Sequence, residues 1–147
     1  MAHFRTTVES AASPSAAHAL VADFSNIADW DPGVVSAERL DSGQLGVGSR
    51  FRVVTAFGPR RIPLEYEVLE WDFDHRAVLE ARTRDFRSYD VISTAPTPLG
   101  SAVTYDALLE LNGLRKVLDP ALNVTFQLVG RRAEAGMRRA LRAAAAR

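Results

Sequence analysis

The sequence lacks cysteine altogether, which excludes a disulfide, a thiolate nucleophile and a thiolate metal site. It also lacks any run of about 18 apolar residues, so no membrane-spanning helix is predicted. No charged and then apolar segment follows Met1, so no secretory signal is predicted and we expect a cytoplasmic protein. The three histidines, His3, His18 and His75, lie on separate predicted elements without ligand spacing, which argues against a metal site.

Sequence motifs for nucleophilic serines, phosphates and dinucleotides are absent as well. There is no Gly-x-Ser-x-Gly sequence and no phosphate-binding glycine loop. Gly46 and Gly48 fall in a turn between two predicted strands and do not open a helix. We therefore expect no cofactor.

The residues that are present fit one globular domain spanning 1–147, with 47% apolar and 24% charged residues. The formal net charge is zero but unevenly spread. Residues 115–147 carry eight basic and two acidic side chains, whereas residues 1–114 carry ten basic and sixteen acidic ones. A basic helix can bind nucleic acid or an acidic membrane, but a solvated helix face is the simpler interpretation. We expect no nucleic-acid partner and leave peripheral membrane contact open.

The longest predicted element is a C-terminal helix from Asp119 to Arg142. Asp119 and Pro120 form its start signal, an N-cap carboxylate followed by a proline. Apolar residues then recur mostly every three or four positions, at Leu122, Phe126, Val129, Ala133, Met137, Ala140 and Leu141. The charged residues that must face water are Arg131, Arg132, Arg138, Arg139 and Arg142. The helix is one-sided and needs a broad surface to cover.

The N-terminal part of the chain predicts a strand and two short helices. Residues 3–10 alternate, and their apolar side carries Phe4, Thr6 and Val8. Ser13 and Pro14 give a second cap-plus-proline signal and begin a short helix. Ser25 is predicted to cap another short helix before the Asp-Pro-Gly segment 31–33 breaks the chain.

From Gly33 onward the apolar period changes to two for about eighty residues, which predicts six short strands joined by turns. Strands at this spacing form an antiparallel meander. Side chains predicted to face inward include Phe51, Phe57, Leu64, Tyr66, Val68, Ala77, Leu79, Ala81, Val103, Tyr105 and Ala107. With the first strand the sheet has seven members, and a sheet of that size curls. The predicted fold class is α+β.

Several stretches spread over nearly the whole chain together resemble a known family. They are Ser13-Pro14 with Val21-Ala22-Asp23-Phe24, Trp30-Asp31-Pro32-Gly33-Val34, Gly46-Val47-Gly48-Ser49-Arg50-Phe51, Tyr66-Glu67-Val68, and Gly113 through Asp119-Pro120. With the order of elements, they resemble the helix-grip fold of the START-like superfamily. Within it, the chain looks like the small polyketide cyclase/dehydrase or lipid-transport proteins. The resemblance implies a seven-stranded curved antiparallel sheet around the long C-terminal helix, and a ligand carrier, receptor or aromatase/cyclase as the activity.

A curled sheet around a helix can leave an apolar cavity with a few polar groups. Small residues that would enlarge it, or simply permit close packing, are Ala77, Ala81, Ala107, Ala133, Gly130 and Gly136. Tyr66 and Tyr105 face inward by the alternation, and Tyr89 is a third inward candidate. The full set of ligand-binding candidates is Trp30, Phe51, Phe57, Tyr66, Leu79, Tyr89, Tyr105, Leu122, Phe126 and Met137.

Charged residues for catalysis are not found on the predicted inner face. Asp90 and Asp106 would need a shifted register to face inward, so no acid and base pair is named. Arg82 falls on the outward side and would stabilise an anion or enolate only if a bulge turned it inward.

Three hypotheses of function follow from these features. The first is a non-catalytic binder or carrier of a small hydrophobic molecule such as a lipid, isoprenoid or polyketide. The second is a polyketide aromatase/cyclase that would use Tyr66, Tyr105, Tyr89 and Arg82. The third is association with an acidic surface through the arginines of the terminal helix.

Overall fold

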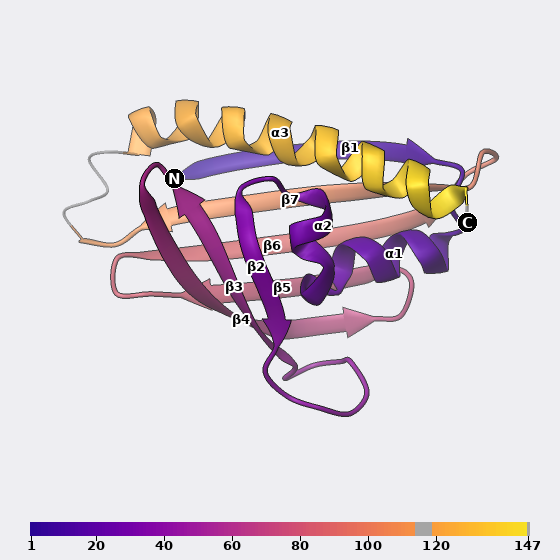
Figure 1. The fold of residues 1–147 in the computed structure, drawn as a ribbon, viewed down its shortest axis with the longest axis horizontal. Coiled ribbons are helices and arrows are strands. Elements are labelled where there is room, and N and C mark those ends of the chain that lie inside the picture. Colours follow the sequence, from indigo (N-terminus) through magenta and orange to yellow (C-terminus); the bar gives the residue numbers. More distant parts are fainter. Residues whose placement is uncertain (114–118, 147) are drawn as a thin grey trace.

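The computed structural model describes residues 1–113 and 119–146, with only the backbone described at 119 and 120. Within these residues, seven strands form one antiparallel sheet in the order β1-β7-β6-β5-β4-β3-β2 (Figure 1). The strands are β1 (Ala2–Ser10), β2 (Val34–Arg39), β3 (Arg50–Phe57), β4 (Arg60–Asp72), β5 (Arg76–Arg82), β6 (Phe86–Pro96) and β7 (Ser101–Leu111). The helices are α1 (Pro14–Ala22), the 3₁₀ turn η1 (Phe24–Asn26), α2 (Ile27–Trp30) and α3 (Asp119–Ala145).

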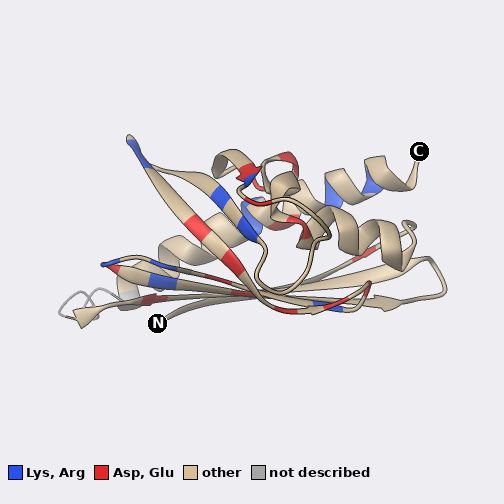
Figure 2. Cartoon of the chain, turned by 90° about the horizontal axis from the view of Figure 1, so that it is seen from below, with Lys and Arg blue, Asp and Glu red and all other residues tan. Residues whose placement is uncertain are grey.

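All the helices lie on one face of the sheet, which curls beside them (Figures 1 and 2). The short helix α1 contacts β6 and β7, and α2 contacts β2. The long helix α3 runs along β1 and contacts α1 and α2, so it meets the sheet mainly at this edge strand. The predicted helix-grip architecture is confirmed, with its seven-stranded curved antiparallel sheet, long C-terminal helix and short helices after the first strand.

Local capping explains where the short helices begin. Ser13 accepts a hydrogen bond from the Ala16 amide at 3.2 Å and Pro14 fills the first turn, as the sequence predicts. The predicted cap at Ser25 is wrong. The carboxylate of Asp23 caps this turn instead, because it accepts a hydrogen bond from the Ser25 amide at 3.0 Å.

The buried side of α3 differs from the predicted stripe at one position. Ala133, Met137 and Leu141 are buried, whereas Val129 is 38% exposed, so its predicted inward position is wrong. Gly130 is the buried residue at this level, and it lies directly against the Phe4 ring of β1. The five predicted surface arginines are exposed.

The helix α3 starts at Asp119 as predicted, but the proposed N-cap role of the Asp119 side chain lies outside the described residues. No helix in the described part of the chain is long and apolar enough to cross a membrane.

Candidate functional site

The inner face of β6 carries a buried carboxylic acid. Ser88, Asp90 and Ile92 alternate toward the helices, and Asp90 is only 3% exposed. The prediction that no carboxylate faces inward is therefore wrong. By the same alternation Tyr89 lies on the outer face, where the Arg87 guanidinium sits 4.6 Å from its ring centroid, so the expectation that Tyr89 faces inward is also wrong.

The apolar pattern of β6 could not reveal this register, because both faces of the strand carry a similar mixture. One face has Phe86, Ser88, Asp90, Ile92 and Thr94, and the other has Arg87, Tyr89, Val91, Ser93 and Ala95. The charge on the neighbouring strand was the usable signal. Glu80 faces outward between the inward Leu79 and Ala81, and its carboxylate lies 2.5 Å from the Arg87 guanidinium, so Arg87 also faces outward. Because side chains alternate along a strand, Ser88 and Asp90 must then face inward.

Two tyrosines and a serine surround the Asp90 carboxyl group. The hydroxyl groups of Tyr66 on β4 and Tyr105 on β7 lie close enough to Asp90 to act on the pKa of its carboxyl group. The Tyr66 hydroxyl also lies 2.8 Å from the Ser88 hydroxyl. We call Tyr66, Ser88, Asp90 and Tyr105 the polar cluster. The inward positions predicted for Tyr66 and Tyr105 are confirmed, since they are 6% and 8% exposed.

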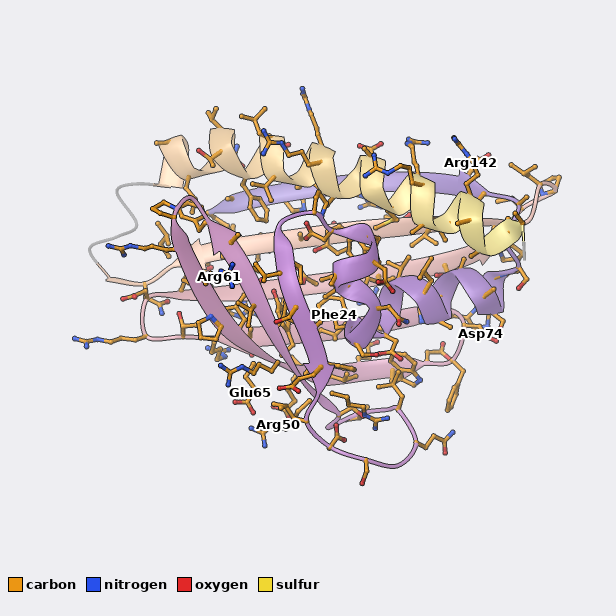
Figure 3. All side chains as sticks on the ribbon, viewed as in Figure 1. Phe24, Arg50, Arg61, Glu65, Asp74 and Arg142 are labelled. Atoms are coloured by element: carbon orange, nitrogen blue, oxygen red, sulfur yellow. The ribbon has the colours of Figure 1, made fainter. Side chains whose placement is uncertain are left out.

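Small side chains leave room for these rings on the sheet surface. Ala107 lies opposite Asp90 on β7, and Ala81 lies between Tyr66 and Ser88. Aromatic residues of η1 and α2 pack against both tyrosine rings, and Figure 3 labels one of them, Phe24. Phe24 meets Tyr66 edge to face at 5.0 Å, and Trp30 meets Tyr105 in the same way at 5.4 Å between ring centroids.

Burial changes the protonation of the polar cluster. Desolvation, followed by the charge of Asp31, raises the pKa of Asp90 to about 8, and hydrogen bonds from Tyr105 and Tyr66 oppose this shift. Burial and then the Asp90 charge raise the pKa of both Tyr66 and Tyr105 well above the usual value. Burial also raises the pKa of Asp31, although its carboxylate accepts the Gly33 amide hydrogen at 2.9 Å. Burial therefore favours the neutral form of Asp90, in which the carboxyl group carries a proton.

The packing around the polar cluster is dense on one side and open on the other. Toward the α1 end of the inner face, Leu79, Ile92 and Val103 are fully buried. Beyond Ser88, toward the start of β4, the start of β6 and the end of β7, the inward side chains remain partly exposed. They are Ile62, Phe86, Leu109 and Leu111. On α3 the same change occurs, because Met137 and Leu141 are buried but Leu122 and Phe126 are only half-buried. We call this region the open end.

The structure separates the ten predicted ligand-binding residues into groups. Trp30, Phe51, Leu79 and Met137 are buried in the core at 1% exposure or less. Tyr66 and Tyr105 belong to the polar cluster, while Leu122 and Phe126 lie at the open end. Phe57 ends β3 beside the hairpin to β4 and is 51% exposed, and Tyr89 lies on the outer face.

The small residues that were expected to enlarge a cavity have different environments. Ala77, Ala81, Ala107 and Ala133 are buried. Gly130 and Gly136 do not enlarge anything, because a Cβ at Gly130 would overlap the Phe4 ring and one at Gly136 would overlap the Trp30 carbonyl oxygen. These two glycines let α3 approach β1 and α2 closely.

The described arginine side chains lie on the surface rather than on the buried inner face. Arg82 is exposed and pairs with Glu80 at 2.7 Å, so it stays on the outward side as predicted. Arg50 and Glu65 form another ion pair on β3 and β4 (Figure 3). No arginine in the described part of the chain is buried. The inner face therefore has acidic groups without a basic partner.

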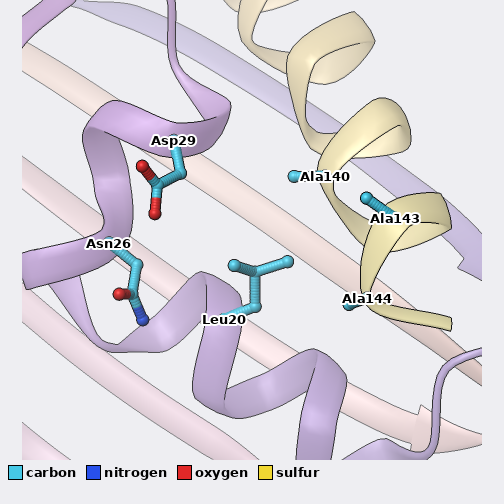
Figure 4. A pocket seen from close by; sticks show the side chains of 6 residues that line it. All are labelled: Leu20, Asn26, Asp29, Ala140, Ala143 and Ala144. Atoms are coloured by element: carbon cyan, nitrogen blue, oxygen red, sulfur yellow. The ribbon is translucent and has the colours of Figure 1, made fainter. Parts of the chain in front are cut away.

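Two further features lie apart from the polar cluster. An open pocket of about 500 Å³ lies between α1, the η1–α2 segment and the end of α3, and its lining is Leu20, Asn26, Asp29, Ala140, Ala143 and Ala144 (Figure 4). His18 is buried, lies 2.7 Å from the Thr94 hydroxyl through Nδ1, and has its pKa lowered by burial. Among residues 1–113 and 119–146, no three acidic or histidine side chains form a group that could hold a metal.

Solved structures share this fold at low sequence identity. A START superfamily protein from Mycobacterium smegmatis has a TM-score of 0.78 and 15% identity, with 95% of this chain and 96% of that chain covered. TTHA0849 from Thermus thermophilus has a TM-score of 0.75 and 20% identity, with 93% of this chain and 94% of that chain covered. The comparison with curated proteins finds no match.

The sequence itself matches one family over its full length. The match covers residues 1–147, and the family is described as polyketide cyclase / dehydrase and lipid transport. This description fits an inner face that combines apolar side chains with a few hydroxyl and carboxyl groups. The chain therefore belongs to the polyketide cyclase/dehydrase and lipid transport family, within the START-like fold.

Proposed function

We propose that the chain binds a small hydrophobic molecule, such as a lipid, isoprenoid or polyketide, at the open end between the sheet and α3. The observation that carries this proposal is the change in burial along the inner face. Apolar side chains that point toward the helix layer are fully buried at one end and partly exposed at the other. A ligand that covers these side chains removes apolar surface from water, which favours binding by about 25 cal/mol per Å² of apolar surface buried.

Two measurements test the proposal. Native mass spectrometry of gently purified protein should show co-purified mass, and fluorescent lipids should bind at tens of micromolar or below. The sequence offers a matched pair of variants on β7. Leu109 points inward and Leu108 points outward, and both are half-buried. Leu109→Trp should weaken probe binding at least about tenfold by filling the open end, whereas Leu108→Trp should leave it unchanged. Equal effects of the two variants, or no binding by the wild type, would reject the proposal.

A second candidate function is acid-base catalysis of polyketone cyclisation and dehydration. It is favoured by Asp90, a neutral carboxylic acid at ordinary pH beside two tyrosine hydroxyls. In this reaction Asp90 donates its proton to a ketone oxygen as an enol carbon of the same polyketone molecule bonds to the ketone carbon. The enol hydroxyl becomes a ketone and gives its proton back to the Asp90 carboxylate, so Asp90 is protonated again for the dehydration. Loss of water and of a proton from the neighbouring carbon then gives the double bond. Arg82 and Tyr89 take no part, because both lie on the outer face.

The catalytic candidate is tested with a polyketone substrate and product analysis. Asp90→Asn should lower the cyclisation rate about a hundredfold or more if Asp90 is the proton donor. Asp106→Asn is the matched control, because Asp106 lies on the outer face of the next strand and pairs with His3 at 2.7 Å. Product that is unchanged in Asp90→Asn, Tyr66→Phe and Tyr105→Phe would rule out catalysis and leave the carrier function.

A further inference from the structure

The α1 helix is attached to the sheet mainly through one histidine. The helix packs on β5, β6 and β7, and its buried side chains are Ala17, His18, Val21 and Ala22 (Figure 1). His18 is the largest of these four and is 1% exposed. Its contact with the Thr94 hydroxyl, 2.7 Å from Nδ1, is the only hydrogen bond between α1 and the sheet in the described part of the chain. The attachment of α1 therefore depends on the His18 imidazole.

The surroundings of His18 suit a neutral imidazole and not an imidazolium ion. The Nε2 atom is buried and has no hydrogen-bond partner among the described residues. The ring lies against Trp71, with 5.6 Å between the ring centroids, and the indole N–H can only donate. A second proton on His18 would leave a charged N–H group buried without an acceptor, which costs free energy.

The charged groups that act on His18 come from the hairpin between β4 and β5. They are Asp74, His75 and Asp72, all three exposed. The two carboxylates attract a proton on His18, but neither forms a hydrogen bond with the ring. Burial outweighs their attraction and lowers the pKa of His18. The hairpin therefore does not supply the counter-charge that a buried imidazolium needs.

The helix α1 covers apolar side chains at its end of the inner face. Ile92 lies two positions from Thr94 on β6, Val103 lies opposite Thr94 on β7, and both are fully buried. A helix of nine residues is not stable by itself in water, so α1 remains helical through its contacts. All the strand pairings of the sheet lie outside α1. This helix can therefore leave the sheet while the seven strands stay paired.

We propose that α1 is an acid-sensitive flap, which leaves the sheet when His18 takes up a second proton from solvent. At neutral pH the imidazole holds α1 against Thr94. In acid the imidazolium is more stable in water than between α1 and the sheet, so the open form becomes more populated. Opening uncovers Ile92 and Val103 and gives the inner face a second entrance, away from the open end. The use of this entrance as a ligand exit rests on the proposed binding function, whereas the flap itself does not.

Hydrogen exchange measured by mass spectrometry tests the flap in the full chain. Protection factors compare observed with intrinsic exchange rates, so they report the opening equilibrium at each pH. Between pH 7.5 and 5.0 the α1 protection factors should fall about fivefold to thirtyfold, because the open form binds a proton near the usual pKa of 6.5 and the closed form binds it more weakly. They should stay below those of β6 and β7 at both pH values. Equal protection of α1 and β6, or α1 protection that does not change with pH, would contradict the inference.

Variants identify the group that responds to pH. His18→Asn carries its amide at the level of Nδ1 and cannot be protonated, so its α1 protection should be independent of pH, although lower because the side chain is smaller. His18→Phe keeps the ring size without a charge, and the same independence is expected if the asparagine variant is too unstable to measure. His75→Asn is the matched control, because His75 is exposed, and it should keep the wild-type response. A response lost in His75→Asn and kept in the His18 variants would overturn the proposal.

Release of a neutral probe tests the second entrance. The probe 1-ethylpyrene has no titratable group, so a change of its release rate with pH comes from the protein. In stopped-flow fluorescence, release should be faster at pH 5.0 than at pH 7.5 for the wild type and equal at both pH values for His18→Asn. Equal release rates in the wild type would reject the exit. No binding of the probe would reject the proposed function together with the exit, and hydrogen exchange then decides the flap alone.

Discussion

The hydroxyl groups of Tyr66 and Ser88 lie 2.8 Å apart across the strand between them, because Ala81 occupies the intervening position on β5. The methyl side chain of Ala81 is small enough to leave this bond unobstructed. Ala81 is 1% exposed, so a larger residue has nowhere to move. The bond therefore depends on a residue that has no polar atom in its side chain.

Ala81→Leu should separate Tyr66 from Ser88 and overpack the inner face. The expected loss in the free energy of unfolding is about 1 to 3 kcal/mol, measured by urea denaturation. Ala95→Leu on β6 is the control, because Ala95 is exposed and its replacement should change stability by less than about 0.5 kcal/mol. A stable Ala81→Leu protein with unchanged probe binding would show that this spacing does not matter.

Asp90 should make the protein less stable as the pH rises from 7 to 9. Its pKa is about 8 in the folded chain and near 3.8 when unfolded, so the folded state holds the proton more tightly. The contribution of this proton to the free energy of unfolding is fully present below about pH 4 and is lost as the pH rises through about 8. Relative to Asp90→Asn, the wild type should lose about 1 to 1.5 kcal/mol of unfolding free energy between pH 7 and 9.

This pH window also avoids the titration of His18. Burial lowers the pKa of His18, so that residue destabilises the fold only in acid, below its usual pKa of 6.5. Denaturation curves of the wild type and Asp90→Asn at pH 7, 8 and 9 provide the measurement. Parallel pH dependence of the two proteins would mean that Asp90 does not hold a proton in the folded state.

Gly136→Ala should destabilise the protein even though alanine is the better helix former. A Cβ at this position would overlap the carbonyl oxygen of Trp30, a backbone atom that cannot rotate away. We expect a net loss of about 1 to 3 kcal/mol, opposite in sign to the helix propensity gain of about 1 kcal/mol. Thermal unfolding would measure it. At the exposed neighbour, Ala135→Gly should cost about 1 kcal/mol through propensity alone.

The orientation of α3 about its own axis can be tested with two apolar residues, Met137 and Val129. Met137 is fully buried and Val129 is 38% exposed, although the sequence pattern places both on the covered side. Met137→Ala should cost about 2 to 5 kcal/mol, whereas Val129→Ala should cost less than about 1 kcal/mol. Similar losses for the two variants in urea denaturation would mean that Val129 is packed in solution.

The sequence was informative wherever one periodicity dominated. Alternation on β7 places Tyr105 correctly, because its outward neighbours Thr104 and Asp106 are polar or charged. On β5 the charged Glu80 places Leu79 correctly, although its other neighbour, Val78, is apolar. On β6 the two faces have similar polarity, so Asp90 could be placed only by considering Glu80 on the next strand. On α3, an apolar Val129 beside a glycine hides the fact that Gly130 takes the buried position. In both cases tertiary contacts with another element determine the side-chain direction.

The pairing of β1 with β7 has a consequence for biosynthesis. Ser10 pairs with Ser101 and Ala2 with Leu109, so the first strand of this sheet cannot pair until the last strand has been synthesised. Until then Phe4 and Val8 have no neighbouring strand on the sheet, and closing so long a loop carries an entropic cost before any contact rewards it. We therefore expect truncated nascent chains that end before β7 to be bound by chaperones and to be sensitive to proteases, with native structure gained only after β7 has been translated.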